Sequence, residues 1–167
     1  MDDEARFRRA VEFVLAHEGE LSEDPDDPGG VTKYGISARS YPELGPEGIR
    51  RLTREQAIAI YRRDWWDRYG YARLPDPVAA KVFDLAVNMG PSAAHRILQL
   101  ALRTCGFPVA ADGVLGPQTL EAAHRADPER LMPELRAEAA LHYALLVLQS
   151  PDRRRKYLRG WLRRACA

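Results

Sequence analysis

The chain has 167 residues, a length that suits one compact domain with a single core, or one domain with a small helical appendage. Hydrophobic residues make up 46% and charged residues 29% of it, which is an ordinary globular composition. The net charge is +1, and no apolar stretch approaches the roughly 18 residues of a membrane span. Composition therefore predicts a globular chain and excludes a transmembrane helix.

Helix signals recur along most of the chain. Three dipeptides put a capping residue directly before proline, and one segment has the spacing of a capping box. These sites are Asp76-Pro77, Asp127-Pro128, Ser150-Pro151 and Thr53–Gln56. Apolar residues repeat at helical spacing between them. The predicted helices span residues 3–18, 53–69, 77–89, 92–104, 117–126, 128–149 and 151–165.

Residues 19–37 differ from the rest because they are dense in Gly, Pro and Asp. The short β-prone run Val31–Ile36 lies near their end. We predict an ordered loop with at most a short β-hairpin, since loops of this length in compact domains are often functional. The fold class predicted for the whole chain is mainly α.

Glu18 is out of place on the first predicted helix. Phe7, Val11 and Val14 form its apolar stripe, and Glu18 is the next member at helical spacing. It precedes Gly19, a helix terminator, so it lies at the negative end of the helix dipole. An apolar surround and that dipole both raise the pKa of a carboxyl group, as a general acid requires. The alternative is a frayed helix end whose glutamate points into water.

A glycosidase pairs its acid with a second carboxylate across the scissile bond, which either attacks or holds a water. The following loop offers Asp24, Asp26 and Asp27, and then Thr32, whose hydroxyl can orient a water. Turn chemistry is the preferred explanation for Asp24 and Asp26, since Asp-Pro and Pro-Gly are common turn dipeptides. Asp27 borders the turn Pro28–Gly30, which can direct it back to the helix end, so it remains a candidate.

Several segments of the chain are similar to segments of a known protein family. The N-terminal ones are Glu18-Gly19, Asp24–Gly30 and Thr32–Ser37; the later ones are Val82–Gly90, Leu98-Gln99, Asp112–Leu120 and Gly160–Arg163. The first group resembles the signature of glycoside hydrolase family 108, N-acetylmuramidases found as phage endolysins and as lytic accessories of bacterial protein export. The second group resembles the peptidoglycan-binding helical region that accompanies this family.

This resemblance implies a lysozyme-like helical fold with an active-site loop. Residues 1–75 would form the catalytic part and residues 76–167 a peptidoglycan-binding part packed on the same core. It implies Glu18 as catalytic acid, with Asp27 and Thr32 in supporting roles. The departure is Glu20, which stands where the motif has a second glycine, followed by Leu21 in place of an aromatic residue.

Sugar sites combine aromatic faces with a few polar groups. The candidate substrate-binding residues are Tyr34, Trp65, Trp66, Asp84 and Asn88. Adjacent tryptophans on a helix point about 100° apart, so at most one of the pair faces the cleft and the other belongs to the core. Asp84 and Asn88 lie one turn apart on an apolar helix, which fits either a structural hydrogen-bond network or contacts to the glycan.

The histidines form no HExxH pattern and the cysteines no zinc spacing, so we predict neither a metal site nor a cofactor. The expected partner is the glycan strand of peptidoglycan and not nucleic acid, bound by a monomer. The basic tail Arg153–Arg164 indicates a solvated helix face or electrostatic contact with the anionic envelope. The N-terminus lacks the order of a secretory signal, so we expect synthesis in the cytoplasm and release by a holin or an export system.

Other functions stay open at this point. A lytic transglycosylase would break the same bond, and a wall-binding secretion accessory would use the aromatic residues without Glu18. A nucleic-acid-binding helical protein would depend on the basic tail instead. The order of Glu18, loop and Thr32 favours the muramidase.

Overall fold

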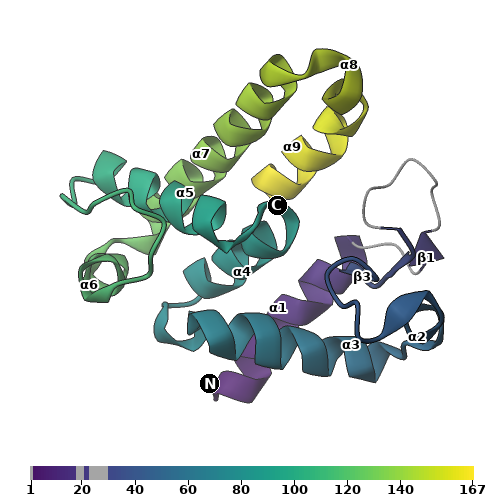
Figure 1. Ribbon diagram of the computed structural model, residues 1–167. Coiled ribbons are helices and arrows are strands. Elements are labelled where there is room, and N and C mark those ends of the chain that lie inside the picture. The colour runs from purple at the N-terminus through teal and green to yellow at the C-terminus, as the bar shows by residue number, and fades with distance from the viewer. Residues whose placement is uncertain (1, 18–20, 23–29) are drawn as a thin grey trace. The chain divides into compact units, whose positions relative to one another are not determined.

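The computed structural model describes residues 2–17, 21–22 and 30–167. It is mainly α, as predicted, with one small sheet (Figure 1). The contacts divide the chain into two compact units, residues 1–70 and 71–167. The predicted boundary at 75/76 stays a prediction. No helix among the described residues is both long and apolar enough to cross a membrane.

The N-terminal unit is built on α1 and on one long helical segment. Its helices are α1 (Asp3–His17), α2 (Gly45–Arg51), α3 (Arg54–Tyr61) and the π-helical η1 (Arg62–Asp67). The apolar stripe predicted for α1 is buried, with Phe7 1% exposed and Val11 and Val14 fully buried. The predicted capping box is confirmed, because the Thr53 side chain accepts from Gln56 N and the Gln56 side chain accepts from Thr53 N.

The sheet of this unit has three strands of two residues each, one strand more than the single hairpin expected. The strands are β1 (Leu21–Ser22), β2 (Thr32–Lys33) and β3 (Ile36–Ser37), antiparallel in the order β1-β2-β3. Tyr34 and Gly35 connect β2 to β3 with φ of 52° and 77°. Positive φ at both loop residues is the mark of a type I′ turn, whose twist suits a two-residue hairpin.

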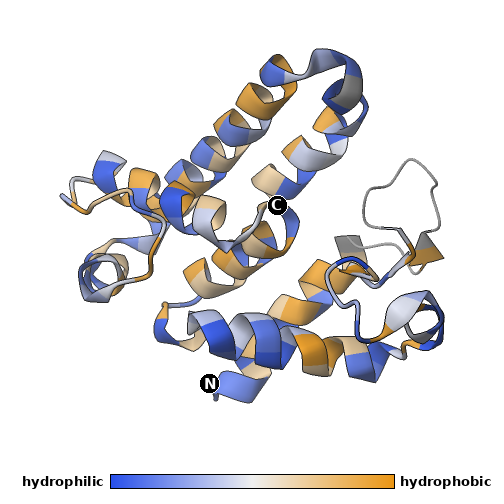
Figure 2. Ribbon diagram, in the orientation of Figure 1, coloured by the Kyte–Doolittle hydropathy of each residue, from blue (hydrophilic) through white to orange (hydrophobic). Residues whose placement is uncertain are grey.

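All secondary-structure elements described in the C-terminal unit are helices. They are η2 (Tyr71–Arg73), α4 (Val78–Met89), α5 (Pro91–Thr104), α6 (Pro117–Arg125), α7 (Pro128–Gln149), α8 (Pro151–Arg154), η3 (Arg155–Tyr157) and α9 (Leu158–Cys166). Helices α4, α5, α7 and α9 pack against one another in succession. Hydrophobic and hydrophilic residues follow one another along α7 (Figure 2), and its leucines Leu141, Leu145 and Leu148 are exposed. Leu131, Leu135 and Ala139 on its inner side are fully buried.

Some local predictions were wrong. Asp127 caps α7 through Glu129 N at 3.0 Å, but the N-cap residue of α4 is Pro77 and not Asp76, and Ser150 provides no side-chain cap for α8. The Asp76–Pro77 bond is cis and α4 begins at Val78, one residue later than expected. The predicted helix 151–165 is three successive elements, and α2 was not predicted because Gly45 and Gly48 weaken any helix signal.

Candidate active site in the N-terminal unit

The catalytic prediction concerns the segment directly after α1. Glu18 and Asp27 both lie outside the described residues, as do Glu20, Asp24 and Asp26. The described part of α1 does bury Phe7, Val11 and Val14. These are the members of the stripe that Glu18 continues in the sequence.

Thr32 lies at the start of β2, directly opposite Ser22 of β1. Its hydroxyl donates to the carbonyl oxygen of Gly30 at 3.3 Å, and the residue is half-buried. The β1–β2 pair therefore joins the chain on either side of residues 23–29. Thr32 is thereby fixed beside a strand that begins three residues after Glu18 in the sequence.

Tyr34 is held through its backbone. The Tyr61 hydroxyl, on α3, donates to the Tyr34 carbonyl oxygen at 2.9 Å. This bond stabilises a residue that adopts positive φ, which is unfavourable for a tyrosine. The Tyr34 ring is half-buried, and the Lys33 ammonium lies over it at 5.5 Å from the ring centre. Tyr34 thus keeps part of its surface open to solvent, two positions after Thr32 in the sequence.

The two adjacent tryptophans of η1 have different environments. Trp66 is fully buried, its ring centre lies 5.7 Å from that of Phe7, and its indole N–H donates to Asp3 Oδ1 at 3.0 Å. Trp65 is half-buried. Only one of the pair has exposed surface, as helix geometry predicted, and Trp66 has none to offer a sugar.

Trp65 is linked to polar groups that the sequence did not single out. Its side chain is hydrogen-bonded to Tyr41, which is also hydrogen-bonded to Asp64. Arg63 donates to both oxygens of Asp64, at 2.6 and 2.7 Å, and these bonds lower the pKa of Asp64. Burial raises the pKa of Tyr41. Asp64 could have been suspected because it adjoins Trp65, whereas Tyr41 lies in a distant loop and no spacing indicated it.

Asp84 and Asn88 belong to the C-terminal unit. Asp84 is fully buried, and its Oδ1 accepts from Arg164 Nε at 2.9 Å. Lys81 donates to the Arg164 carbonyl oxygen at 2.5 Å, and burial lowers the pKa of Lys81 to about 8. Asn88 is exposed and accepts from the Tyr143 hydroxyl at 2.6 Å. Asp84 thus has the structural partner that a buried carboxylate needs, and glycan contact by either residue stays a prediction.

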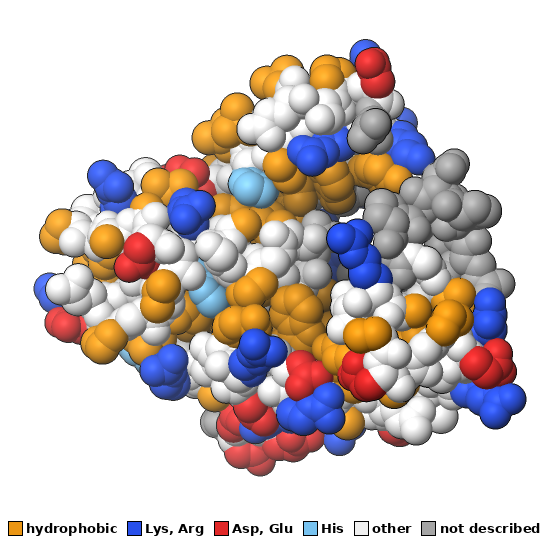
Figure 3. Space-filling model, viewed as in Figure 1, with side chains coloured by type: hydrophobic (Ala, Val, Ile, Leu, Met, Phe, Trp, Pro, Cys, Tyr) orange, Lys and Arg blue, Asp and Glu red, His pale blue; other side chains and the backbone are white. Residues whose placement is uncertain are grey.

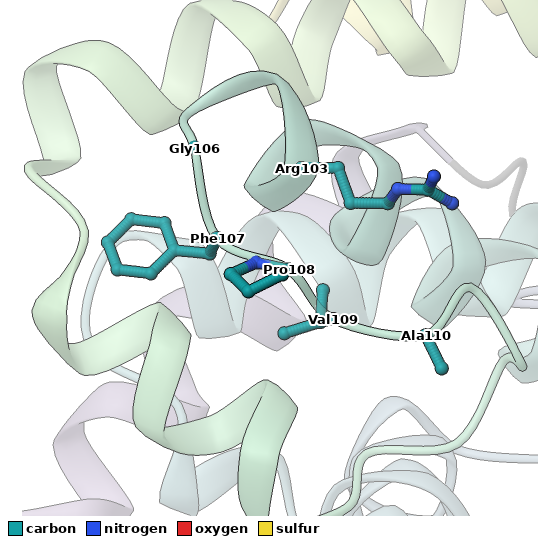
Figure 4. A pocket seen from close by; sticks show the side chains of 6 residues that line it. All are labelled: Arg103, Gly106, Phe107, Pro108, Val109 and Ala110. Atoms are coloured by element: carbon teal, nitrogen blue, oxygen red, sulfur yellow. The ribbon is translucent and has the colours of Figure 1, made fainter.

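A hollow of about 470 Å³ lies on the C-terminal unit, around the turn after α5 (Figure 4). Its lining is Arg103, Gly106, Phe107, Pro108, Val109 and Ala110. No carboxylate is among these residues, so the hollow has no group that could act as the acid of a glycosidase. The described residues contain no group of three or more His, Cys, Asp or Glu side chains arranged to hold a metal ion.

Comparison with known proteins agrees with this arrangement. Residues 11–90 match the family model described as glycosyl hydrolase 108, and residues 93–166 match one described as a predicted peptidoglycan domain. The structure of Brucella abortus SagA is similar at 29% sequence identity and a TM-score of 0.76, over 97% of this chain and 90% of that chain. No curated protein matches the chain significantly.

The fold and these matches define a mainly α glycoside hydrolase that acts on peptidoglycan. Residues 11–90 of the chain match the glycosyl hydrolase 108 family, and residues 93–166 match a peptidoglycan domain. The family resemblance drawn from the loop after Glu18 is thereby confirmed.

Proposed function

We propose that the chain is an N-acetylmuramidase that hydrolyses the β-1,4 bond between N-acetylmuramic acid and N-acetylglucosamine in peptidoglycan. The observation that carries this proposal is the match of residues 11–90 to a glycoside hydrolase family, a segment that contains Glu18, Asp27 and Thr32. The C-terminal peptidoglycan domain supports the choice of substrate.

In this proposal Glu18 is the general acid and protonates the leaving glycosidic oxygen. The buried stripe of α1 supports this role, because Glu18 continues the spacing of that stripe in the sequence. An apolar surround and the negative helix end both favour the protonated carboxyl group near neutral pH. Asp27 and Thr32 hold the attacking water or stabilise the oxocarbenium-like transition state.

Clearing of purified sacculi tests the role of Glu18. Wild-type protein should reduce the turbidity of a sacculus suspension, and Glu18→Gln should slow this by about 10²–10⁴-fold, the usual contribution of a general acid. Sacculus pull-down is the control, since Glu18→Gln should still bind through the peptidoglycan domain. A fully active Glu18→Gln would rule out this mechanism.

The same assay separates the other functions. A wall-binding accessory would bind sacculi without clearing them, and a lytic transglycosylase would clear them with 1,6-anhydro ends. Salt-sensitive DNA binding lost on deletion of residues 151–167 would instead indicate a nucleic-acid-binding protein.

A further inference from the structure

We propose that Trp65 is a carbohydrate platform for an N-acetylated amino sugar of the glycan strand, and that Tyr41 and Asp64 are the positioning residues that fix its orientation. This inference rests on the proposed function, because it assumes a glycan as ligand. It adds two residues, Tyr41 and Asp64, and a physical role for the π-helical segment η1.

The π-helix explains why Trp65 reaches the surface. Ala57, Ile58 and Tyr61 form the buried face of α3. In a continuous α-helix the next residues on the face of Tyr61 would be Asp64 and Trp65, three and four positions on. In η1 the next buried residue is instead Trp66, at the five-residue spacing of a π-helix.

The added residue of the π turn therefore turns Asp64 and Trp65 out of the core. The Asp64 side chain is 23% exposed and Trp65 is half-buried. Single π turns inside helices are frequent at functional sites. As a result of the π turn, Trp65 lies partly at the surface with the Asp64 carboxylate beside it.

The rings around Trp65 leave its indole face uncovered by any parallel ring among the described residues. Tyr61 and Tyr69 lie at 6.5 and 6.2 Å between ring centres, tilted by 52° and 55°. Trp161, in the C-terminal unit, has the opposite environment. Tyr143 and Tyr157 stack on it at 22° and 25°. Trp161 is thus sandwiched between two nearly parallel rings, whereas the rings of Tyr61 and Tyr69 are tilted relative to Trp65 and neither stacks on it.

The Tyr41 hydroxyl links the Trp65 ring to Asp64. An indole nitrogen only donates, so the Trp65 N–H donates to the Tyr41 hydroxyl oxygen. The Tyr41 hydroxyl in turn donates to Asp64, whose two oxygens accept the fork of Arg63. Each donor in this chain has its acceptor, and a side chain fixed in this way loses little entropy when a ligand binds.

The chemistry around Trp65 fits a glycan. An aromatic face next to a partly exposed carboxylate offers an apolar surface for the ring carbons and an acceptor for a hydroxyl or acetamido N–H. Hydrogen bonds from Arg63 lower the pKa of Asp64, so the carboxylate stays an acceptor at neutral pH. On the face seen in Figure 3, Lys and Arg side chains are scattered among hydrophobic and neutral ones rather than gathered in a single basic patch.

The test measures binding of a β-1,4-linked tetramer of N-acetylglucosamine by tryptophan fluorescence, in a Glu18→Gln background so that the probe is not consumed. The parent should show saturable binding. Trp65→Ala should weaken it by on the order of ten-fold or more. Tyr41→Phe keeps the ring but breaks the hydrogen-bond chain, and should weaken binding about three- to ten-fold. In the cleavage-competent protein Tyr41→Phe should raise KM with little change in kcat.

Arg51→Ala is the control within the N-terminal unit, because its exposed side chain on α2 pairs with Glu47 and not with Trp65, Tyr41 or Asp64, and it should bind like the parent. If Tyr41→Phe lowers the melting temperature, Asp64→Asn replaces it as the test variant. Asp64→Asn should also weaken tetramer binding. A parent that does not bind the tetramer, or Tyr41 and Trp65 variants that bind like the parent, would overturn the inference.

Sacculus clearing is scored separately, so the two proposals fail in different ways. Binding that depends on Tyr41 and Trp65, without clearing by wild-type protein, would remove the proposed function and leave the platform. Clearing of sacculi by the wild type, with tetramer binding unaltered in the Tyr41 and Trp65 variants, would remove the platform and leave the proposed function.

Discussion

The side chain of Gln99 organises the loop that precedes α6. Its Nε2 donates to Asp112 Oδ1 at 2.8 Å, and its Oε1 accepts from Gly113 N at 2.8 Å. Gly113 has φ of 81° and lies against Ser92. The Asp112-Gly113 motif, which sequence resemblance attributes to the peptidoglycan-binding region, therefore has a structural role in closing this loop onto α5.

Replacing Gly113 with alanine should destabilise the protein. An added Cβ would lie 2.7 Å from Ser92 Oγ and 2.8 Å from the Ser92 carbonyl oxygen, in a backbone conformation that alanine resists. We expect a loss of about 1–3 kcal/mol in the free energy of unfolding, measured with urea. Gly160→Ala is the control of opposite sign, because that helical glycine has open space around it and should gain about 0.5–1 kcal/mol. Equal effects of both changes would contradict this explanation.

Lys81 gives a second prediction for a single residue. The groups that act on it are Asp84 on its own helix, Arg136 on α7, and Arg164 and Cys166 on α9. Burial lowers its pKa from 10.5 to about 8, so between these pH values the unfolded chain binds more protons than the folded chain. The free energy of unfolding should therefore rise with pH across this window.

Lys81→Met removes this titration. Between about pH 8 and pH 10.5, the free energy of unfolding of the wild type should rise by up to about 3 kcal/mol relative to that of Lys81→Met. Urea unfolding at several pH values measures this difference. Parallel pH profiles for the two proteins would show that Lys81 keeps its ordinary pKa in the folded state.

At the scale of helices, capping geometry separates residues that look alike in the sequence. Asp127 and Ser150 both precede a proline, yet only Asp127 has extended backbone, with φ −66° and ψ 120°, and accepts a bond from the helix. Ser150 has φ −151° and ψ 68° at the tight connection from α7 to α8. Sequence shows the residue types that suit a cap, whereas the path of the chain into the helix decides whether they are used.

Alanine substitutions at these helix starts test the distinction. Thr53→Ala and Asp127→Ala should each lower the free energy of unfolding by about 1 kcal/mol, since each removes an acceptor for an orphan backbone N–H. Ser150→Ala should change it by less than about 0.5 kcal/mol. Thermal unfolding of the three variants side by side is the measurement, and a loss at Ser150 equal to that at Asp127 would contradict it.

The predicted helices and the structure agree best where the apolar period is regular. The stripe of Phe7, Val11 and Val14 predicted α1, and the caps predicted the starts of α3 and α7. The π-helical segment η1 could not be predicted, because it is an exception to the helical period on which such reasoning depends. Tyr41 could not be linked to Trp65 for a similar reason, since only the folded chain brings that loop to η1.

At the scale of the whole molecule, the chain combines a glycoside hydrolase segment with a peptidoglycan domain. Attachment by one segment raises the effective concentration of the glycan at the other, so weak individual contacts suffice for a polymeric substrate. The family and the mainly α class could be recognised from the sequence, because the loop signature after Glu18 is specific. The contacts of Asp84 with Arg164, which anchor the C-terminal helix, appear only in the fold.

The chemical nature of the ends released from sacculi tests the central claim most directly. Digestion by wild-type protein, followed by borohydride reduction and mass spectrometry, should yield fragments that end in reduced N-acetylmuramic acid, and Glu18→Gln should yield almost none. Fragments ending in reduced N-acetylglucosamine, fragments with 1,6-anhydro ends, or no fragments from the wild type would contradict the muramidase.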